Sequence, residues 1–240
     1  MMNIIKISTT FCLAFLISIL IGKFKIFIFI TFISLFHEIG HVLLGLIFRW
    51  PIEKILILPM GCLTVFNTKI NNSYIKELLV TLAGPFFQAV LFFFIKGELY
   101  INCNFYLLLF NLLPIYPLDG YKIMNFFLYQ LFPFKLANKI GVYISFIILL
   151  IIFLLRPTSI MIILILIVFS VQILKYKNDQ NFIFNKFLFE RYLYNINYRR
   201  NVFIKDGKKE KMFRNKKHTF LVENTLLEEK EILRKMFDKL

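Results

Sequence analysis

The chain has 240 residues, of which 59% are hydrophobic and 31 are phenylalanine, and its formal net charge is +15. A mean hydropathy of +0.72 excludes an ordinary soluble domain and indicates a membrane protein with several spans. The three cysteines lie far apart in the sequence, which argues against both a disulfide framework and a cysteine-based zinc site.

Apolar runs predict six membrane-spanning helices. The first run, residues 4–22, has a cleaved signal peptide as its alternative interpretation. Only one basic residue precedes its apolar part and no small-x-small cleavage site follows, so a retained helix is favoured. The other five runs are residues 26–48, 77–95, 101–115, 140–155 and 158–174.

The segment between the second and third runs, residues 51–72, is too short and too interrupted to cross a membrane. It is rich in β-branched and aromatic residues around a turn signal, Pro59-Met60-Gly61, which predicts a hairpin or a re-entrant loop. Lipid does not tolerate exposed strand edges, so we expect a membrane-embedded hairpin that lies against protein or a watery cavity.

Three ionisable side chains, His37, Glu38 and His41, interrupt the second predicted span. An ionisable group near the middle of such a helix costs about 2.5–3.5 kcal/mol by insertion scales, so a cluster of three requires a reason. Positions i and i+4 share one face of a helix. The two imidazoles can therefore bind one zinc ion while Glu38 reaches the water on that metal, as in the HExxH motif of zinc peptidases.

A catalytic zinc usually has three protein ligands, and Asp119 is the natural candidate for the third. The only further histidine, His218, lies in a charged tail and is expected to be an ordinary exposed residue. Residues 117–120 (PLDG) could instead be a simple turn that ends a helix. Helical rise, however, places His41 and Asp119 at similar depths, about 22 and about 27 Å from the start of their spans.

Three segments carry a resemblance to a known family: residues 37–41 (HEIGH), 79–85 (LVTLAGP) and 111–120 (NLLPIYPLDG). Over about residues 26–121 the chain resembles the site-2 protease family of intramembrane zinc metalloproteases. Within that family it looks most like the branch of stage IV sporulation proteases, which cleave the precursor of a late mother-cell sigma factor. The six-span layout and residues 187–192 (FLFERY) support this narrower resemblance.

The resemblance implies one Zn²⁺ per chain, held by His37, His41 and Asp119, with Glu38 as the general base. It implies that Asn111 is a polar group near the scissile peptide that helps to hold the oxyanion. The hairpin would pair with an unwound substrate as an added strand. The implied partners are a membrane-associated protein substrate, the lipid bilayer and inhibitory membrane proteins.

The predicted fold class is an all-α polytopic membrane protein with about six transmembrane helices, a membrane-embedded hairpin and a short cytoplasmic tail. Residues 1–174 would form the metalloprotease domain (core 26–121), and residues 175–240 a basic tail too short for a nucleotide-binding CBS pair. Placing both termini in the cytoplasm leaves only four of the 29 lysines and arginines outside, in agreement with the positive-inside rule.

The tail holds 17 basic and 9 acidic residues and is expected to be a solvated face near anionic headgroups, with no motif for nucleic-acid binding. Residues 225–228 (TLLE) predict a capping box. Leu226, Leu233, Met236, Phe237 and Leu240 predict the apolar stripe of a terminal amphipathic helix. That helix could pack over the cytoplasmic mouth, self-associate or bind a substrate.

Two other functions fit parts of the pattern. The first is a catalytically silent, metal-binding membrane scaffold or regulator, against which the intact Glu38 argues, because loss of that base is the simplest route to silence. The second is a transporter or channel, which would carry polar residues in several spans, whereas here they cluster in two.

Overall fold

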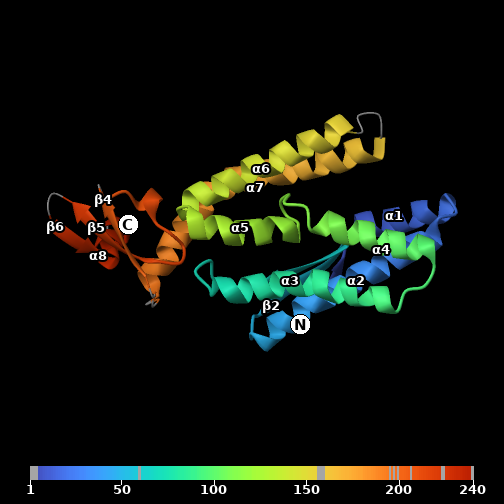
Figure 1. The fold of residues 1–240 in the computed structure, drawn as a ribbon, viewed down its shortest axis with the longest axis horizontal. Helices are drawn as coiled ribbons and strands as arrows, with labels where there is room; N and C mark the ends of the chain where they lie inside the picture. Colours follow the sequence, from blue (N-terminus) through green and yellow to red (C-terminus); the bar gives the residue numbers. More distant parts are fainter. Residues whose placement is uncertain are drawn as a thin grey trace. The chain divides into compact units, whose positions relative to one another are not determined.

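The computed structural model of the chain describes residues 5–58, 61–155, 160–194, 196, 198, 200–205, 207–222 and 225–238. These residues form two compact units, the first made of residues 1–68 and 75–113 and the second of residues 69–74 and 114–240. Each unit combines helices with a three-stranded sheet (Figure 1). The prediction of an all-α fold is therefore correct only in part: the described residues are mostly helical, but two sheets are also present, and local apolar periodicity does not reveal strands such as β1 that pair with distant segments.

The first unit contains the helices that carry the HExxH motif and the hairpin. Its elements are β1 (Ile5–Ile7), α1 (Thr9–Leu20), α2 (Phe24–Ile47), β2 (Ile52–Leu58), β3 (Gly61–Phe66), α3 (Tyr74–Val90), the 3₁₀ turn η1 (Leu91–Phe93) and α4 (Glu98–Asn111). At 1.5 Å per residue the 24-residue α2 is about 36 Å long. It ends shortly before Pro51, where the preceding residues are disfavoured from helical geometry.

The segment predicted to be a hairpin or a re-entrant loop forms a pair of strands, and its membrane-embedded position stays a prediction. Strands β2 and β3 pair antiparallel, with Ile55 opposite Thr64 and Leu58 opposite Gly61, while the turn residues Pro59 and Met60 lie outside the described residues. Strand β1 pairs parallel with β2, so the sheet has the order β1-β2-β3. The first predicted span was therefore wrong at its start, because residues 5–7 form a strand and α1 has only 12 residues.

Among the described residues, three helices are long and apolar enough to cross a membrane. They are residues Phe24–Ile47, Tyr74–Phe93 and Phe134–Leu155. The protein therefore has the helices expected of a membrane protein, although the sequence predicted twice as many crossings. The apolar helix α1 is shorter than a typical span.

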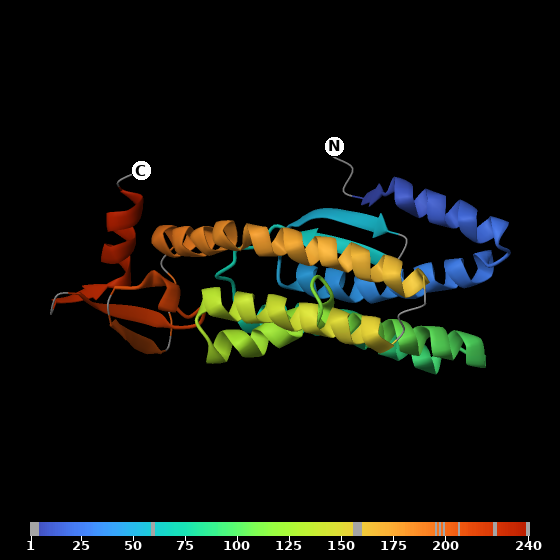
Figure 2. The same cartoon turned by 90° about the horizontal axis from the view of Figure 1, so that it is seen from above.

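The second unit is built on two long helices that lie side by side, α6 (Phe134–Leu155) and α7 (Ile160–Leu193) (Figures 1 and 2). The helix α5 (Asp119–Leu131) packs on α6. The 34-residue α7 continues well past residue 174, where the sequence placed the end of the membrane domain. Its N-terminal half is apolar and its C-terminal half carries most of its charged residues.

The C-terminal part of the second unit is folded rather than a solvated tail. Its elements are β4 (Asn201–Lys205), η2 (Lys209–Lys211), β5 (Lys217–Val222), β6 (Thr225–Glu228) and α8 (Glu229–Phe237), with β4 parallel and β6 antiparallel to β5. Its core joins the ends of α6 and α7 to the sheet and α8, through residues such as Phe134, Phe187, Phe220 and Leu233.

The terminal helix is confirmed, but its predicted start is wrong. Thr225 and Leu226 belong to β6, and the capping box is formed by Glu228 and Glu231 instead. Strand pairing with β5 takes up the residues in which the sequence pattern placed the cap. Leu240 lies outside the described residues.

The prediction that His218 is exposed is also wrong, because its side chain is fully buried. The backbone N–H of Phe213 donates to its Nε2 atom (2.9 Å), so the ring proton lies on Nδ1, 3.0 Å from Glu229 Oε2. Arg191 donates to the other oxygen of Glu229 (2.7 Å) and, through Nη2, to the carbonyls of Phe213, Arg214 and Lys216. This buried network ties α7 to β5 and α8.

The same end of α7 holds the segment that joins β3 to α3. The Glu190 carboxylate accepts hydrogen bonds from the backbone N–H groups of Ile70 (3.0 Å) and Asn71 (2.9 Å). Arg214 donates to the Ile70 carbonyl (2.8 Å), and Arg191 donates to Asn71 Oδ1 (3.1 Å). Residues 69–74 are therefore fixed by the second unit although they connect two elements of the first.

Candidate metal centre

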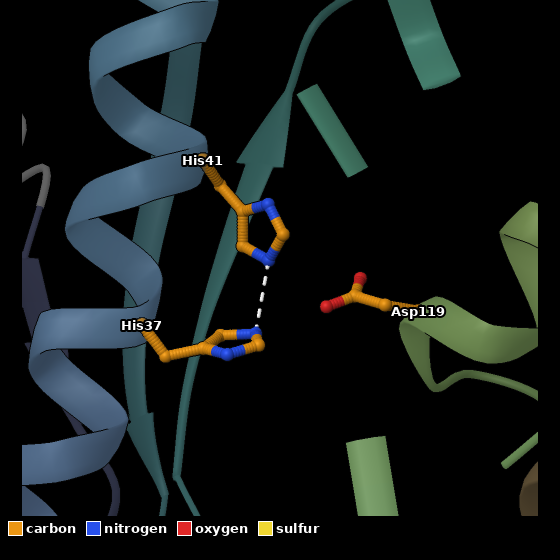
Figure 3. A group of neighbouring side chains, drawn as sticks. All are labelled: His37, His41 and Asp119. Carbon is orange, nitrogen blue, oxygen red and sulfur yellow. Dashed lines mark hydrogen bonds between the residues drawn. The ribbon is translucent and has the colours of Figure 1, made fainter. Parts of the chain in front are cut away.

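The two histidines of the motif lie one helical turn apart on α2 and point the same way (Figure 3). Their Nε2 atoms are 3.1 Å apart, and both side chains are only 6% exposed. The spacing of four residues in an α-helix produces this arrangement directly, as the sequence predicted.

The other ring nitrogen of each histidine faces an oxygen acceptor. His37 Nδ1 is 2.9 Å from Gln88 Oε1, and His41 Nδ1 is 2.7 Å from the Val80 carbonyl oxygen. A carbonyl oxygen only accepts, so each Nδ1 carries the ring proton and each Nε2 presents a lone pair. Two lone pairs that face each other need a cation between or beside them, so this pair fits a metal ion.

A second layer of hydrogen bonds fixes Gln88. Its Nε2 atom donates to the backbone oxygen and the Oδ1 atom of Asn104, both at 3.1 Å, and Asn104 donates back to the Gln88 carbonyl (3.4 Å). The backbone oxygen of Asn104 can only accept, so the Gln88 atom that faces it must be the amide nitrogen. The amide oxygen of Gln88 therefore faces His37. Both side chains are fully buried. The chain of contacts therefore runs from α4 through α3 to the histidine on α2.

Close backbone approach makes room for the imidazoles. A Cβ atom on Gly84 would collide with the His41 ring and lie 2.7 Å from His37 Nε2, so the α3 backbone packs directly on the pair. A Cβ atom on Gly40 would lie 2.8 Å from the carbonyl carbon of Ala83. The small residues at 83–84 thus allow the two helices to approach closely.

Glu38, the predicted base, is buried beside the pair and is held by the hairpin. Its Oε1 atom accepts a hydrogen bond of 2.6 Å from the backbone N–H of Thr64 in β3. The bond engages one carboxylate oxygen and fixes the direction of the other. A carboxylate held next to two imidazoles can take and return a proton.

Asp119 belongs to the second unit, where it is the first residue of α5 and only 7% exposed. Lys122, one turn later, places its ammonium group 3.1 Å from Asp119 Oδ1. Figure 3 draws Asp119 with the two histidines of α2, and each of these three residues offers one ligand atom to a metal. Asn111, the last residue of α4 in the first unit, is partly buried.

Sequence reasoning missed Gln88, Asn104 and Thr64. Gln88 and Asn104 left a signal, since each is a polar amide inside an otherwise apolar helix, where an unpartnered amide is costly. Thr64 left no signal in the sequence, because it contributes a backbone N–H group, which every residue except proline has.

Comparisons with known proteins point to one kind of enzyme, although no protein-family model matches the chain. Over 192 residues the chain is 27% identical to stage IV sporulation protein FB of Bacillus subtilis, which covers 73% of this chain and 67% of that protein. Over 185 residues it is 32% identical to a zinc metalloprotease of Methanocaldococcus jannaschii, with 68% of this chain covered. That alignment spans only 54% of the relative's length.

A solved structure gives a further comparison. The site-2 protease from Methanocaldococcus jannaschii matches with a TM-score of 0.57 and 25% identity. The match covers 73% of this chain and 92% of the solved chain.

Proposed function

We infer that the chain belongs to the site-2 protease family of zinc metalloproteases, and we propose that it is an intramembrane zinc endopeptidase that cleaves a membrane-associated protein within or near the bilayer. The observation that carries this proposal is the histidine pair, whose Nε2 atoms face each other at 3.1 Å with both Nδ1 atoms already hydrogen-bonded. Glu38 stands next to this pair on the same helix.

In this proposal His37, His41 and Asp119 hold one zinc ion, each through one ligand atom. The bound ion would supply a Lewis acid that polarises the scissile carbonyl and makes water a better nucleophile. Glu38 takes a proton from the attacking water and later gives it to the leaving amine. Asn111 donates from its side-chain amide toward the developing oxyanion.

The hairpin is proposed as the surface that receives the substrate. Strand β3 is at the edge of the sheet β1-β2-β3, so a stretched substrate segment can add to it as a further strand. The hydrogen bond from Thr64 of the same strand to Glu38 supports this proposal, in which the general base acts beside the strand that receives the substrate. We propose a sporulation sigma-factor precursor as the substrate, on the likeness to stage IV sporulation protein FB alone.

We further propose six crossings with both termini in the cytoplasm. Three helices with the length and composition of a span support the membrane location. The placement of lysines and arginines supports the orientation.

The test compares the wild-type protein with Glu38→Gln in liposomes, with fluorescently labelled casein as a general unfolded substrate and zinc content measured in parallel. The expected result is one zinc per chain in both proteins and chelator-sensitive cleavage in the wild type alone. Glutamine keeps the size of the side chain but cannot accept the proton. Zinc in both proteins with cleavage in neither would favour the silent scaffold, and equal cleavage by both would remove Glu38 from its role.

A further inference from the structure

A cavity of about 340 Å³ opens between α6 and α7 in the second unit. Six polar side chains line it together with the ring of Phe184: Lys135, Asn138, Lys139, Lys177, Gln180 and Asn181. Three of the six carry a positive charge and three carry an amide, and the described lining residues include no carboxylate. The wall of the cavity is therefore suited to an anion.

Asn138 is placed to donate a hydrogen bond into this cavity. It is 4% exposed, and its Oδ1 atom accepts from the hydroxyl groups of Tyr129 (2.7 Å) and Tyr176 (3.1 Å). The two tyrosines thereby take up the acceptor end of the amide. Among the described residues none accepts a hydrogen bond from the Asn138 amide nitrogen, which is the end left for a ligand. Gln180, which donates to the Asn138 carbonyl (3.2 Å), is held at the same wall.

The lysines lie where the apolar parts of both helices stop. In α6, Lys139 is followed by the uncharged and largely apolar run of residues 140–155, and in α7 the uncharged run ends at Leu174, just before Lys175 and Lys177. The charged groups therefore lie at one end of the candidate span Phe134–Leu155, where lipid headgroups are expected once that helix crosses a membrane. Lys135 also pairs with Glu210, but at 3.8 Å and with an exposed carboxylate this pair is weak.

We propose that this cavity binds the phosphate group of an anionic phospholipid. A phosphate diester offers acceptor oxygens and a negative charge to the three ammonium groups and to Asn138. Basic pockets between transmembrane helices are suited to such headgroups. The ligand chemistry is that of phosphate, which a lipid headgroup or free phosphate could supply, and the proposal does not depend on proteolytic activity.

The test measures lipid binding by the full chain in nanodiscs. Phosphatidylglycerol is titrated into a phosphatidylcholine background, and bound lipid is counted by native mass spectrometry for the wild type and for Lys139→Gln/Lys177→Gln. The matched control is Lys23→Gln/Lys25→Gln, which removes two exposed lysines from the end of another span, α2. We expect the cavity variant to lose about tenfold or more in apparent affinity and the control to stay within about twofold of the wild type.

A competition arm separates the sources of phosphate. Displacement of the lipid by millimolar inorganic phosphate would show that a free phosphate anion also occupies the site, whereas binding that inorganic phosphate does not displace would assign the site to the lipid; both outcomes support the proposal. Equal binding of phosphatidylglycerol and phosphatidylcholine by the wild type would overturn it. So would an unchanged affinity in the cavity variant, provided that circular dichroism shows native helix content.

Discussion

Replacing Gln88 by leucine tests whether the contacts behind His37 set the affinity for zinc. Gln88 Oε1 lies 2.9 Å from His37 Nδ1, and Gln88 Nε2 lies 3.1 Å from two oxygens of Asn104. Leucine fills most of the same volume in a fully buried position but accepts no hydrogen bond. The His37 proton can then move to Nε2, the atom that must present a lone pair to the metal.

The expected loss follows from the type of contact removed. Substituting a hydrogen-bond partner behind a metal-binding histidine costs about 10–100-fold in metal affinity, which corresponds to about 1.4–2.7 kcal/mol. The Oδ1 atom of Asn104 also loses its donor, and an unsatisfied buried acceptor lowers the free energy of unfolding by about 1–3 kcal/mol. The two effects differ in their readout, since only the first changes the zinc dissociation constant of the folded protein.

The assay is competition for zinc between the purified protein and a chromophoric chelator. Gln88→Glu keeps an acceptor for His37 Nδ1 and should retain more of the affinity than Gln88→Leu. Thr31→Val is the matched control, because it removes from α2 a hydroxyl group that donates to the Phe27 carbonyl of the same helix (2.9 Å). A folded Gln88→Leu protein with wild-type zinc affinity would refute the reasoning, since the Gln88 contact would then not orient the ligand.

Three further outcomes are expected. Gly84→Ala should lower the free energy of unfolding by about 1–3 kcal/mol and reduce the zinc content, because the new Cβ atom collides with the imidazoles. An unchanged melting temperature and an unchanged zinc content would contradict this packing. Arg191→Met should destabilise the C-terminal sheet by about 3–5 kcal/mol, because Glu229 stays buried without its partner, and hydrogen exchange in β5 and α8 measures this. Acid should weaken the same region. Burial lowers the pKa of His218 from 6.5, and although burial alone would raise the pKa of Glu229, the bonds from His218 and Arg191 hold it below 4.5. At acid pH the unfolded chain therefore binds more protons than the folded chain. The free energy of unfolding is highest above pH 6.5 and falls as the pH drops below that value. Equal protection from hydrogen exchange at pH 5.5 and pH 7.5 would argue against this.

The sequence by itself determined the features that depend on neighbours along the chain. The spacing of His37 and His41 places two imidazoles on one helix face, and the helical period alone guarantees this. The long apolar runs of α2 and α6 predict helices of membrane length. The hairpin followed from β-branched residues on both sides of a short turn signal, since its two strands are adjacent in sequence.

The tertiary structure decided everything that joins residues distant in sequence. Gln88 lies 51 residues from His37, and Thr64 lies 26 residues from Glu38, so no local pattern could pair them. The burial of His218 depends on a sheet in which β4 and β5 pair across an intervening connection, and a charged, basic stretch gives no hydropathy signal for it. Helical and alternating periodicities report only which face of one element is apolar. The partner of that face is chosen by packing and hydrogen bonding between elements, and these appear only once the chain has folded.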